Sequence, residues 1–272
     1  MILEPEQFRN FEHAGWQTIP VEYHQAFGNL TSQAIGPLLA AVRLKSGMTL
    51  LDVASGPGYV AAAAAKRGAT VIGVDFSAAM VAHAQQLHPE AEFREGDAER
   101  LPFGTGVFDA VVMNFGILHL GQPQAALVEG HRVLRSGGRF AFSVWAKPEE
   151  TIGFEIVLRA VDRHGEPRVK LPEGPPFFRY SDPDECTRGL IVAGFESATV
   201  TKVAQTWRLP AGEGLFNAMR DSTVRTAGLL RAQKPSVLEK IRDSMRVELE
   251  KYTQGDVVEL PMPALIASGV KS

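Results

Sequence analysis

The 272-residue sequence predicts an α/β fold, built on a mostly parallel sheet with helices on both of its faces. Between residues 49 and 145, short apolar runs alternate with segments in which apolar residues recur at helical spacing. The first apolar run ends in a small-residue loop, Asp52-Val53-Ala54-Ser55-Gly56-Pro57-Gly58, and a helical pattern follows at once. Gly56 and Gly58 carry no Cβ, so this loop lets backbone approach a ligand closely.

The alternation predicts five strands and three helices in this part of the chain. The strands are expected over residues 49–54, 70–74, 91–94, 107–114 and 138–145, and the helices over 59–67, 77–87 and 123–134. Gly68 is placed to end the first helix, and Ser77 can cap the second.

The remaining sequence predicts more helices and two further strands. Helices are expected over 152–161, over 183–193 up to Gly194, and over most of 211–252 with a break at Pro235. One strand, straight or bent, is expected over 196–209. A last strand is expected over 257–267, where Pro261 and Pro263 favour an edge or bulged position.

The composition narrows the class of protein. The net charge is −3 and no basic run is present, so a nucleic-acid partner is not expected. The single cysteine, Cys186, cannot form an internal disulfide, which favours a cytoplasmic location. The first seven residues do not form a signal-peptide pattern, and no apolar run approaches a membrane span. No zinc-ligand spacing occurs, so no metal is expected.

Ligands of open α/β sheets bind at the carboxyl ends of the strands, so the residues that follow each strand predict the site. Asp75 follows the second strand and could accept from both hydroxyls of a ribose, or it could be a turn aspartate. Asp97 follows the third and could accept from an adenine amino group beside the Ala98 amide, or it could bind its own backbone. The apolar loop 114–120 follows the fourth and is expected to line a cleft.

The glycine loop allows more than one ligand. In the register G-x-G-x-x-G it places Gly56, Gly58 and Ala61, which keeps a dinucleotide site open. A phosphate loop of the G-x-x-x-x-G-K-[ST] type is absent from the sequence.

Five motifs in order carry a resemblance to a known family. They lie at 52–58, 74–80, 96–103, 108–112 and 134–140. Together they resemble the class I S-adenosylmethionine-dependent methyltransferases, of the ubiquinone and menaquinone biosynthesis type that methylates small molecules. The resemblance covers residues 47 to about 145. It implies a Rossmann-like, doubly wound, mostly parallel seven-stranded sheet with an antiparallel last strand and helical lid insertions.

The resemblance also implies a division of the chain. A single methyltransferase domain is expected, with its core at 31–148, 183–209 and 255–270. Lid or substrate elements are expected at 1–30, 149–182 and 210–254. The long connections favour this division, since they usually form lids or binding elements.

The resemblance implies cofactor roles for residues at the strand ends. Residues of the first loop would wrap the methionine part of S-adenosylmethionine, and those after the second and third strands would hold the ribose and adenine. The residues implied are Tyr23, Ala54, Ser55, Gly56, Gly58, Asp75, Phe76, Met80, Gly96, Asp97, Ala98, Asn114 and Phe115. The family often has glycine at position 54, and the alanine here suggests that the backbone is not forced to positive φ.

Methyl transfer from a sulfonium is an in-line displacement, which needs a general base only when the accepting atom loses a proton. His119 is the candidate base, with a histidine bonded to local backbone as the alternative. His13 and His24 lie in an N-terminal segment that could fold over the pocket.

The expected acceptor is a small apolar or aromatic molecule. Six apolar residues could line its site or form the core of the lid: Phe154, Phe177, Phe178, Phe216, Met219 and Leu229. Arg220 and Arg225 could meet an acidic group of the acceptor or be solvated.

Two alternatives stay open. An NAD(P)-dependent oxidoreductase would share the glycine loop and Asp75, but it leaves Gly96-Asp97-Ala98 unexplained and the sequence has no Tyr-x-x-x-Lys pair. A non-catalytic S-adenosylmethionine-binding protein would keep the cofactor site alone. The sequence predicts neither the oligomeric state nor the atom that is methylated.

Overall fold

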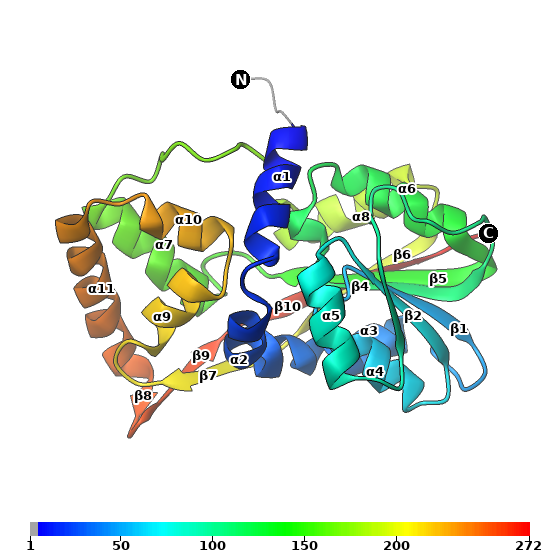
Figure 1. The fold of residues 1–272 in the computed structure, drawn as a ribbon, viewed down its shortest axis with the longest axis horizontal. Helices are drawn as coiled ribbons and strands as arrows, with labels where there is room; N and C mark the ends of the chain where they lie inside the picture. Colours follow the sequence, from blue (N-terminus) through cyan, green and yellow to red (C-terminus); the bar gives the residue numbers. More distant parts are fainter. Residues whose placement is uncertain (1–4) are drawn as a thin grey trace.

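The computed structural model describes residues 5–272, and the larger part of the chain is built on a seven-stranded sheet (Figure 1). The strands lie in the order β3-β2-β1-β4-β5-β10-β6. Strand β10 runs antiparallel to both of its neighbours, whereas β1 to β5 are mutually parallel. The bounds are β1 (Thr49–Val53), β2 (Thr70–Asp75), β3 (Glu92–Glu95), β4 (Phe108–Asn114), β5 (Leu134–Trp145), β6 (Glu196–Val203) and β10 (Ala264–Val270). The predicted fold class is confirmed.

Helices cover both faces of this sheet, as its buried central strands require. One face carries α3 (Ile35–Ala41), α4 (Tyr59–Ala65) and α5 (Ala78–Leu87), and the other carries α6 (Pro123–Val133) and α8 (Pro183–Val192). The predicted helix ends are present. Ser77 Oγ accepts from the Met80 amide at the start of α5, and Gly68 takes φ +82° after α4.

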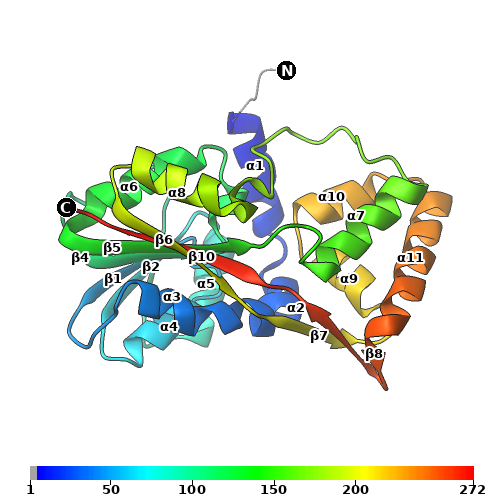
Figure 2. The ribbon, with the colours of Figure 1, turned by 180° about the vertical axis from the view of Figure 1, so that it is seen from behind.

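A second sheet of three strands lies beyond the carboxyl edge of the first, in the order β7-β9-β8. Its strands are β7 (Thr206–Pro210), β8 (Thr253–Gln254) and β9 (Val257–Pro261). Each of the last two predicted strands is therefore two strands. Figure 2 shows β6 continuing into β7 and β9 continuing into β10.

The prediction of single strands at 196–209 and 257–267 is wrong because the chain changes sheets at both places. Pro263 has no N–H for a ladder, and the break opposite it falls at Gln205. The amide of Met262 donates to Gln205 O over 2.9 Å, so the two breaks are tied to each other.

Helices form the smaller part around the second sheet. They are α7 (Ile152–His164), α9 (Gly214–Asp221), α10 (Arg225–Arg231) and α11 (Pro235–Leu249). Pro235 opens α11, so the predicted break is present. Ile241, Met245 and Leu249 bury one face of α11, and Trp207 of β7 is 1% exposed. Short 3-10 turns complete the chain: η1 (Ser32–Ala34), η2 (Ile117–His119), η3 (Arg179–Ser181) and η4 (Glu250–Tyr252).

Two N-terminal helices, α1 (Pro5–Trp16) and α2 (Pro20–Thr31), lie between the two parts (Figure 1). Gln17 at the end of α1 accepts from the Ala79 amide of α5, and Trp207 Nε1 of β7 donates to Ala26 O of α2. The N-terminal segment thus contacts both the sheet core and the helical part. The prediction that the N-terminus is not a signal peptide concerns the first seven residues. The first four of these lie outside the residues that the structure describes. No helix within 5–272 is long and apolar enough to cross a membrane.

Candidate active site

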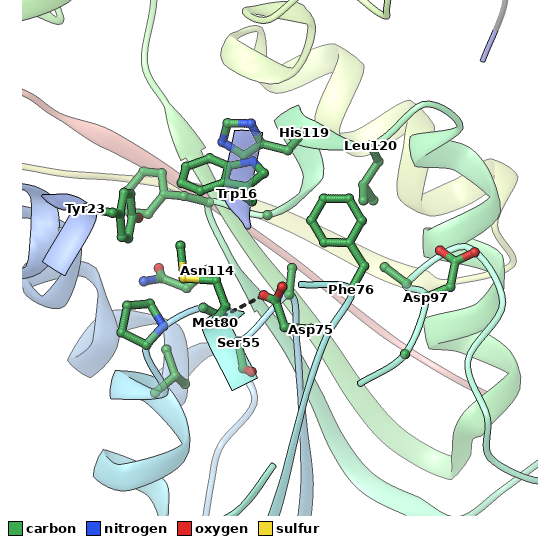
Figure 3. Close-up of a pocket in the computed structure, with 18 of the residues that line it drawn as sticks. Trp16, Tyr23, Ser55, Asp75, Phe76, Met80, Asp97, Asn114, His119 and Leu120 are labelled. Carbon is green, nitrogen blue, oxygen red and sulfur yellow. Dashed lines mark hydrogen bonds between the residues drawn. The ribbon is translucent and has the colours of Figure 1, made fainter. Parts of the chain in front are cut away.

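A cavity opens at the carboxyl ends of β1, β2 and β4, beneath α1 (Figure 3). Counted with its open mouth, which includes space open to solvent, its empty volume is about 910 Å³. Twelve of the thirteen predicted cofactor residues line it, and so does the candidate base His119. The twelve are Tyr23, Ala54, Ser55, Gly56, Asp75, Phe76, Met80, Gly96, Asp97, Ala98, Asn114 and Phe115.

Gly58, the thirteenth, does not belong to the cavity wall. It takes φ +83°, and a Cβ there would stand 2.5 Å from Phe93 Cζ. Its amide donates to Ser55 O over 2.9 Å. The glycine is therefore required by the turn and by the close approach of Phe93, rather than by a ligand.

Asp75 is 6% exposed at the end of β2. Its Oδ2 accepts from the Gly56 amide over 2.8 Å and its Oδ1 from the Ser77 amide over 2.9 Å. Burial raises the pKa of Asp75, and these two amides and the more distant His119 and His13 oppose the rise. Asp75 is thus a turn aspartate and a cavity residue at once, and its oxygens keep lone pairs for further donors.

Ala54 corrects an expectation. Its φ is +52°, although the alanine suggested that positive φ is not required there. The loop after β4 approaches the loop after β1 closely at this point, since a Cβ on Gly116 would stand 2.5 Å from Ala54 Cβ. The left-handed backbone at Ala54 costs energy that the packed surroundings must supply.

Asp97 is held on both oxygens. Its Oδ1 accepts from the Glu99 amide over 2.9 Å, so the carboxylate does bind its own backbone. Its Oδ2 pairs with Arg9 of α1 over 2.6 Å. Asp97 therefore also anchors the helix that covers the cavity.

Asn114 and Phe115 are fixed by Ser143 of β5. Ser143 Oγ donates to Asn114 Oδ1 over 2.6 Å and accepts from the Phe115 amide over 2.9 Å. Phe115 takes φ +55°, and its ring stacks on Trp145 at a centroid distance of 4.1 Å. The wall of the cavity is rigid at this strand end.

His119 is bonded to a side chain from α1 rather than to local backbone. Its Nδ1 lies 3.0 Å from Oε2 of Glu12, which is fully buried. The rings of His119 and Trp16 meet edge to face at a centroid distance of 4.9 Å. Figure 3 shows His119 above Trp16 at the cavity, on the side away from Asp97. This environment fixes one ring nitrogen and leaves the other for a ligand.

A second compartment adjoins the cavity and shares Trp16, Tyr23, Phe115 and His119 with it. It measures about 400 Å³. Four further aromatic residues and the start of α10 complete its lining: Phe27, Trp145, Phe154, Phe177, Ser222, Thr223, Val224, Arg225 and Thr226. The compartment is therefore mainly aromatic.

The residues predicted to line an acceptor site divide in two. Phe154 and Phe177 line the second compartment. The other four, Phe178, Phe216, Met219 and Leu229, pack in or against the core of the helical part instead. Of the two arginines, Arg225 lines the compartment and pairs with Glu12, whereas Arg220 pairs with Asp221 over 2.6 Å.

The two other N-terminal histidines lie beside the cavity rather than in its wall. The rings of His13 and Phe76 meet edge to face at a centroid distance of 5.3 Å. His24 Nδ1 lies 2.6 Å from the Tyr59 hydroxyl.

Sequence reasoning did not single out eight cavity residues, whereas Gly116 and Leu120 belong to the loop 114–120 that was expected to line a cleft. Most of the eight sit in or next to a motif, or on α1, whose sequence carries no motif. They are Arg9, Trp16, Thr31, Pro57, Tyr59, Val60, Glu99 and Gly121. Proximity to the glycine loop could have identified Pro57, Tyr59 and Val60. Nothing in the sequence around Arg9 or Trp16 indicates a site.

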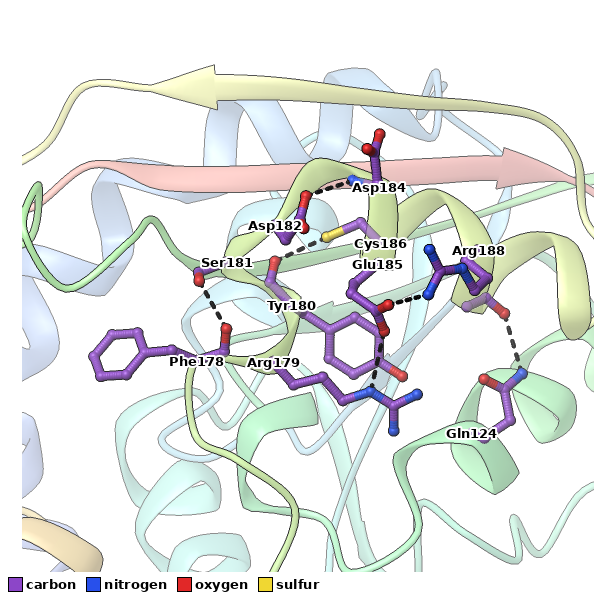
Figure 4. Close-up of polar contacts among 11 residues, drawn as sticks. Gln124, Phe178, Arg179, Tyr180, Ser181, Asp182, Asp184, Glu185, Cys186 and Arg188 are labelled. Atoms are coloured by element: carbon purple, nitrogen blue, oxygen red, sulfur yellow. Dashed lines mark hydrogen bonds and ion pairs between the residues drawn. The ribbon is translucent and has the colours of Figure 1, made fainter.

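Cys186 lies away from the cavity, in the polar cluster that begins α8 (Figure 4). Its Sγ donates to Tyr180 O over 2.9 Å, and Asp182 caps the helix by accepting from the Asp184 amide. Burial raises the pKa of the Cys186 thiol to about 12, so the thiol is unreactive. The cluster fixes the end of the loop that follows α7.

The cavity suits S-adenosylmethionine better than a dinucleotide. The glycine loop has no lysine or arginine to meet a phosphate, and Arg9 is paired with Asp97. Ser55 Oγ is buried at the cavity wall without a hydrogen-bond partner, so a ligand's polar group has an acceptor or donor there. Within residues 5–272 no three His, Cys, Asp or Glu side chains gather as metal ligands.

Comparison with known proteins supports S-adenosylmethionine as the ligand of this class of protein. Residues 51–142 match a family described as a methyltransferase domain. A demethylmenaquinone methyltransferase of Beutenbergia cavernae is 40% identical over 123 residues, 43% of this chain and 51% of the relative. That of Streptomyces griseus subsp. griseus is 30% identical over 173 residues, 62% of this chain and 74% of the relative. The chain thus spans about half the length of some curated relatives and about three quarters of another.

A solved structure shares the fold. The Haemonchus contortus phosphoethanolamine N-methyltransferase 2, in complex with S-adenosyl-L-methionine, superposes with a TM-score of 0.59 at 20% identity. The superposition covers 97% of this chain and 60% of that one.

The strand order and the position of the cavity define a class I methyltransferase fold. The matched domain and the Streptomyces relative go further. The chain belongs to the S-adenosylmethionine-dependent methyltransferases of the menaquinone and ubiquinone type, and S-adenosylmethionine is the cofactor of this class.

Proposed function

We propose that this protein transfers a methyl group from S-adenosylmethionine to a small acceptor with an apolar, aromatic body. The observation that carries the proposal is the pair of adjoining compartments, one bounded by the glycine loop and Asp75 and one mainly aromatic, that share Tyr23, Phe115 and His119. A donor in the first and an acceptor in the second would meet at this shared wall.

Each compartment suits one reactant. Asp75 offers carboxylate oxygens to the ribose of the cofactor, and the Gly56 backbone leaves space for its methionine part. The aromatic residues of the second compartment offer flat apolar surface to a ring-bearing acceptor. The demethylmenaquinone substrate named for the relatives has such a ring, which supports the same class.

The protein's share of the chemistry is positioning. The accepting atom attacks the methyl carbon in line with the bond to sulfur, so alignment and exclusion of water lower the barrier. Trp16 and Tyr23 cover the shared wall and keep water from it. His119 takes the proton of the acceptor where the accepting atom carries one.

A methyl-transfer assay tests this proposal. Purified protein is incubated with radiolabelled S-adenosylmethionine and a panel of hydroxylated naphthalenes, hydroxylated benzenes and aliphatic amines. We expect label in at least one aromatic acceptor and none in the aliphatic amines. Tight binding of S-adenosylmethionine without transfer to any acceptor would favour the non-catalytic alternative. Tight binding of NADH instead would favour the oxidoreductase.

The prediction of a cytoplasmic location rests on the cysteine usage, and the absence of a nucleic-acid partner is likewise a prediction from charge.

A further inference from the structure

A buried carboxylate on α1 connects three segments that are distant in sequence. Glu12 is fully buried, and its Oε2 accepts from Trp16 Nε1 over 3.0 Å and lies 3.0 Å from His119 Nδ1. Its Oε1 accepts from Arg225 Nε over 3.0 Å. Glu12 thus joins α1 to η2 of the sheet core and to α10 of the helical part.

Arg225 holds this cluster from the other side. Its Nη1 donates to Pro175 O over 2.8 Å, and its guanidinium lies over the Phe8 ring at 4.2 Å. Burial by itself raises the pKa of Glu12, but the charges and hydrogen bonds of His119 and Arg225 outweigh it, so the pKa of Glu12 lies below its ordinary value. The negative charge of this buried, ionised carboxylate therefore acts directly on His119 and Arg225.

We propose that Glu12 is the positioning residue of His119: it accepts the Nδ1 proton and so leaves Nε2 free to take the proton of the acceptor. Because Glu12 belongs to α1 and Arg225 to α10, the base is assembled only where both helices have closed over the site. The catalytic consequence rests on the proposed function, but the geometry of the pair does not.

The pairing narrows the acceptor class. The lone pair of an acceptor O–H or N–H forms the new bond to the methyl carbon, and the electrons of the carbon–sulfur bond stay on sulfur, which gives S-adenosylhomocysteine. The acceptor's proton passes to Nε2 of His119 and later to solvent. The Glu12 carboxylate stabilises the imidazolium meanwhile. The acceptor is therefore a phenol, an enol or an amine that must lose a proton.

Other charges act on the same histidine. Glu12 contacts it directly, while Asp75 at the end of β2 interacts with it at longer range and Arg225 compensates Glu12 from α10. The charge of His13 of α1 lowers the pKa of Asp75 in turn. The uncharged rings of Phe177 and Trp16 lie edge to face with the His119 ring. Removal of the Glu12 charge is expected to dominate, because Glu12 is the group in hydrogen-bond contact.

The test uses NMR of the full chain labelled with ¹⁵N-histidine, with His119→Gln to assign the signal. In the unmodified protein we expect the neutral form of His119 to be protonated at Nδ1. In Glu12→Gln we expect its titration midpoint to fall by about one to three pH units. With an acceptor in hand, kcat should fall at least about tenfold and the acid limb of its pH profile should move with the midpoint, at unchanged S-adenosylmethionine affinity.

Gln17→Ala is the matched control. Gln17 anchors the same helix through the Ala79 amide and Ser77 Oγ, but it lines neither compartment. We expect this variant to leave the His119 tautomer and midpoint unchanged.

Three results would overturn the inference: a neutral His119 protonated at Nε2 in the unmodified protein, an unchanged midpoint in Glu12→Gln, or an equal shift in Gln17→Ala. The first needs no variant, so it decides even where Glu12→Gln does not fold. Failure of the unmodified protein to methylate any acceptor would instead contradict the proposed function, and the NMR result would still stand by itself.

Discussion

The amide of Gly56 donates to Oδ2 of Asp75 over 2.8 Å, so the loop after β1 is tied to the end of β2 by the carboxylate that lines the cavity. One side chain therefore both shapes the glycine loop and lines the cavity. Changes at Asp75 should affect cofactor binding both directly and through the loop.

Asp75→Asn should weaken S-adenosylmethionine binding about 10- to 100-fold, because it removes a charged acceptor and one of its two backbone bonds. Isothermal titration calorimetry measures the change. Asp109→Asn is the control, since Asp109 also accepts a backbone amide, that of Thr49, but lies outside the cavity. Equal affinities of the Asp75→Asn and unmodified proteins would show that Asp75 does not hold the ribose.

Gly116→Ala should lower both stability and cofactor affinity. The φ of Gly116 is −79°, which alanine adopts freely, so the obstacles to a Cβ are Ala54 Cβ at 2.5 Å and Met113 Cγ at 2.9 Å. Overpacking of this kind costs roughly 1–3 kcal/mol. Chemical denaturation measures the loss.

Ala54→Gly should partly rescue Gly116→Ala, because it removes the nearer of the two opposing atoms and supplies the residue that favours φ +52°. A double variant no more stable than Gly116→Ala alone would contradict this account of the close approach.

Glu12→Leu should destabilise the fold by about 3–5 kcal/mol, since it leaves the half-buried Arg225 without its anion. Pairing it with Arg225→Met should recover much of that loss. Urea denaturation of both single variants and the double variant gives the coupling energy of the pair. Additive losses would mean that the two charges do not depend on each other.

The pH dependence of stability should follow the same carboxylate. The pKa of Glu12 is lower in the folded chain than in the unfolded one, so its contribution is present above the unfolded value. That contribution is lost as the pH falls through the lower, folded value.

For Asp52 we expect the opposite pH dependence of stability. It is 1% exposed with Oδ1 lacking a hydrogen-bond partner, and burial raises its pKa to about 8. The folded chain therefore keeps a proton between about pH 4 and 8 that the unfolded chain has lost, so this stabilising contribution declines as the pH rises through that window.

Asp52→Asn should remove this dependence, which amounts to at most about 1.4 kcal/mol per pH unit. Thermal or urea unfolding at several pH values compares the two proteins. Parallel stability curves for Asp52→Asn and the unmodified chain would mean that Asp52 does not titrate in this range.

Thr226→Phe should block the second compartment, because Thr226 lines it and makes none of the hydrogen bonds that fix the neighbouring Thr223. We expect the KM for the acceptor to rise at least about tenfold while S-adenosylmethionine binding stays unchanged. Thr226→Val, of nearly the same size, is the control. An unaltered KM in Thr226→Phe would place the acceptor elsewhere.

Local signals predicted the cofactor half of the molecule well. The residues after β1 to β4 follow strands with clear apolar runs, and parallel strands bring their carboxyl ends to one edge, so Asp75, Asp97 and Asn114 had to meet. The positive φ of Ala54 was not predictable, because alanine rarely adopts it and no local motif indicates it.

The helical half depends on contacts between distant segments. The change of sheet at Gln205 and Pro263 arises from packing beside α2, and a run rich in β-formers does not encode which sheet it joins. Glu12 and Trp16 sit in a helix of ordinary polarity, and only the docked position of that helix brings Trp16 to the cavity and Glu12 to His119.

The continuation of β6 into β7 and of β9 into β10 has a consequence for building chimaeras. Everything from residue 205 to 262 leaves and re-enters the main sheet through two paired arms held together at Gln205 and Met262. The two ends of this segment therefore lie side by side, so it can be exchanged at two adjacent junctions. Recombination at those junctions exchanges α9 to α11, including Arg225 and Thr226, while β6 and β10 stay in the main sheet and no residue that lines the first cavity is replaced.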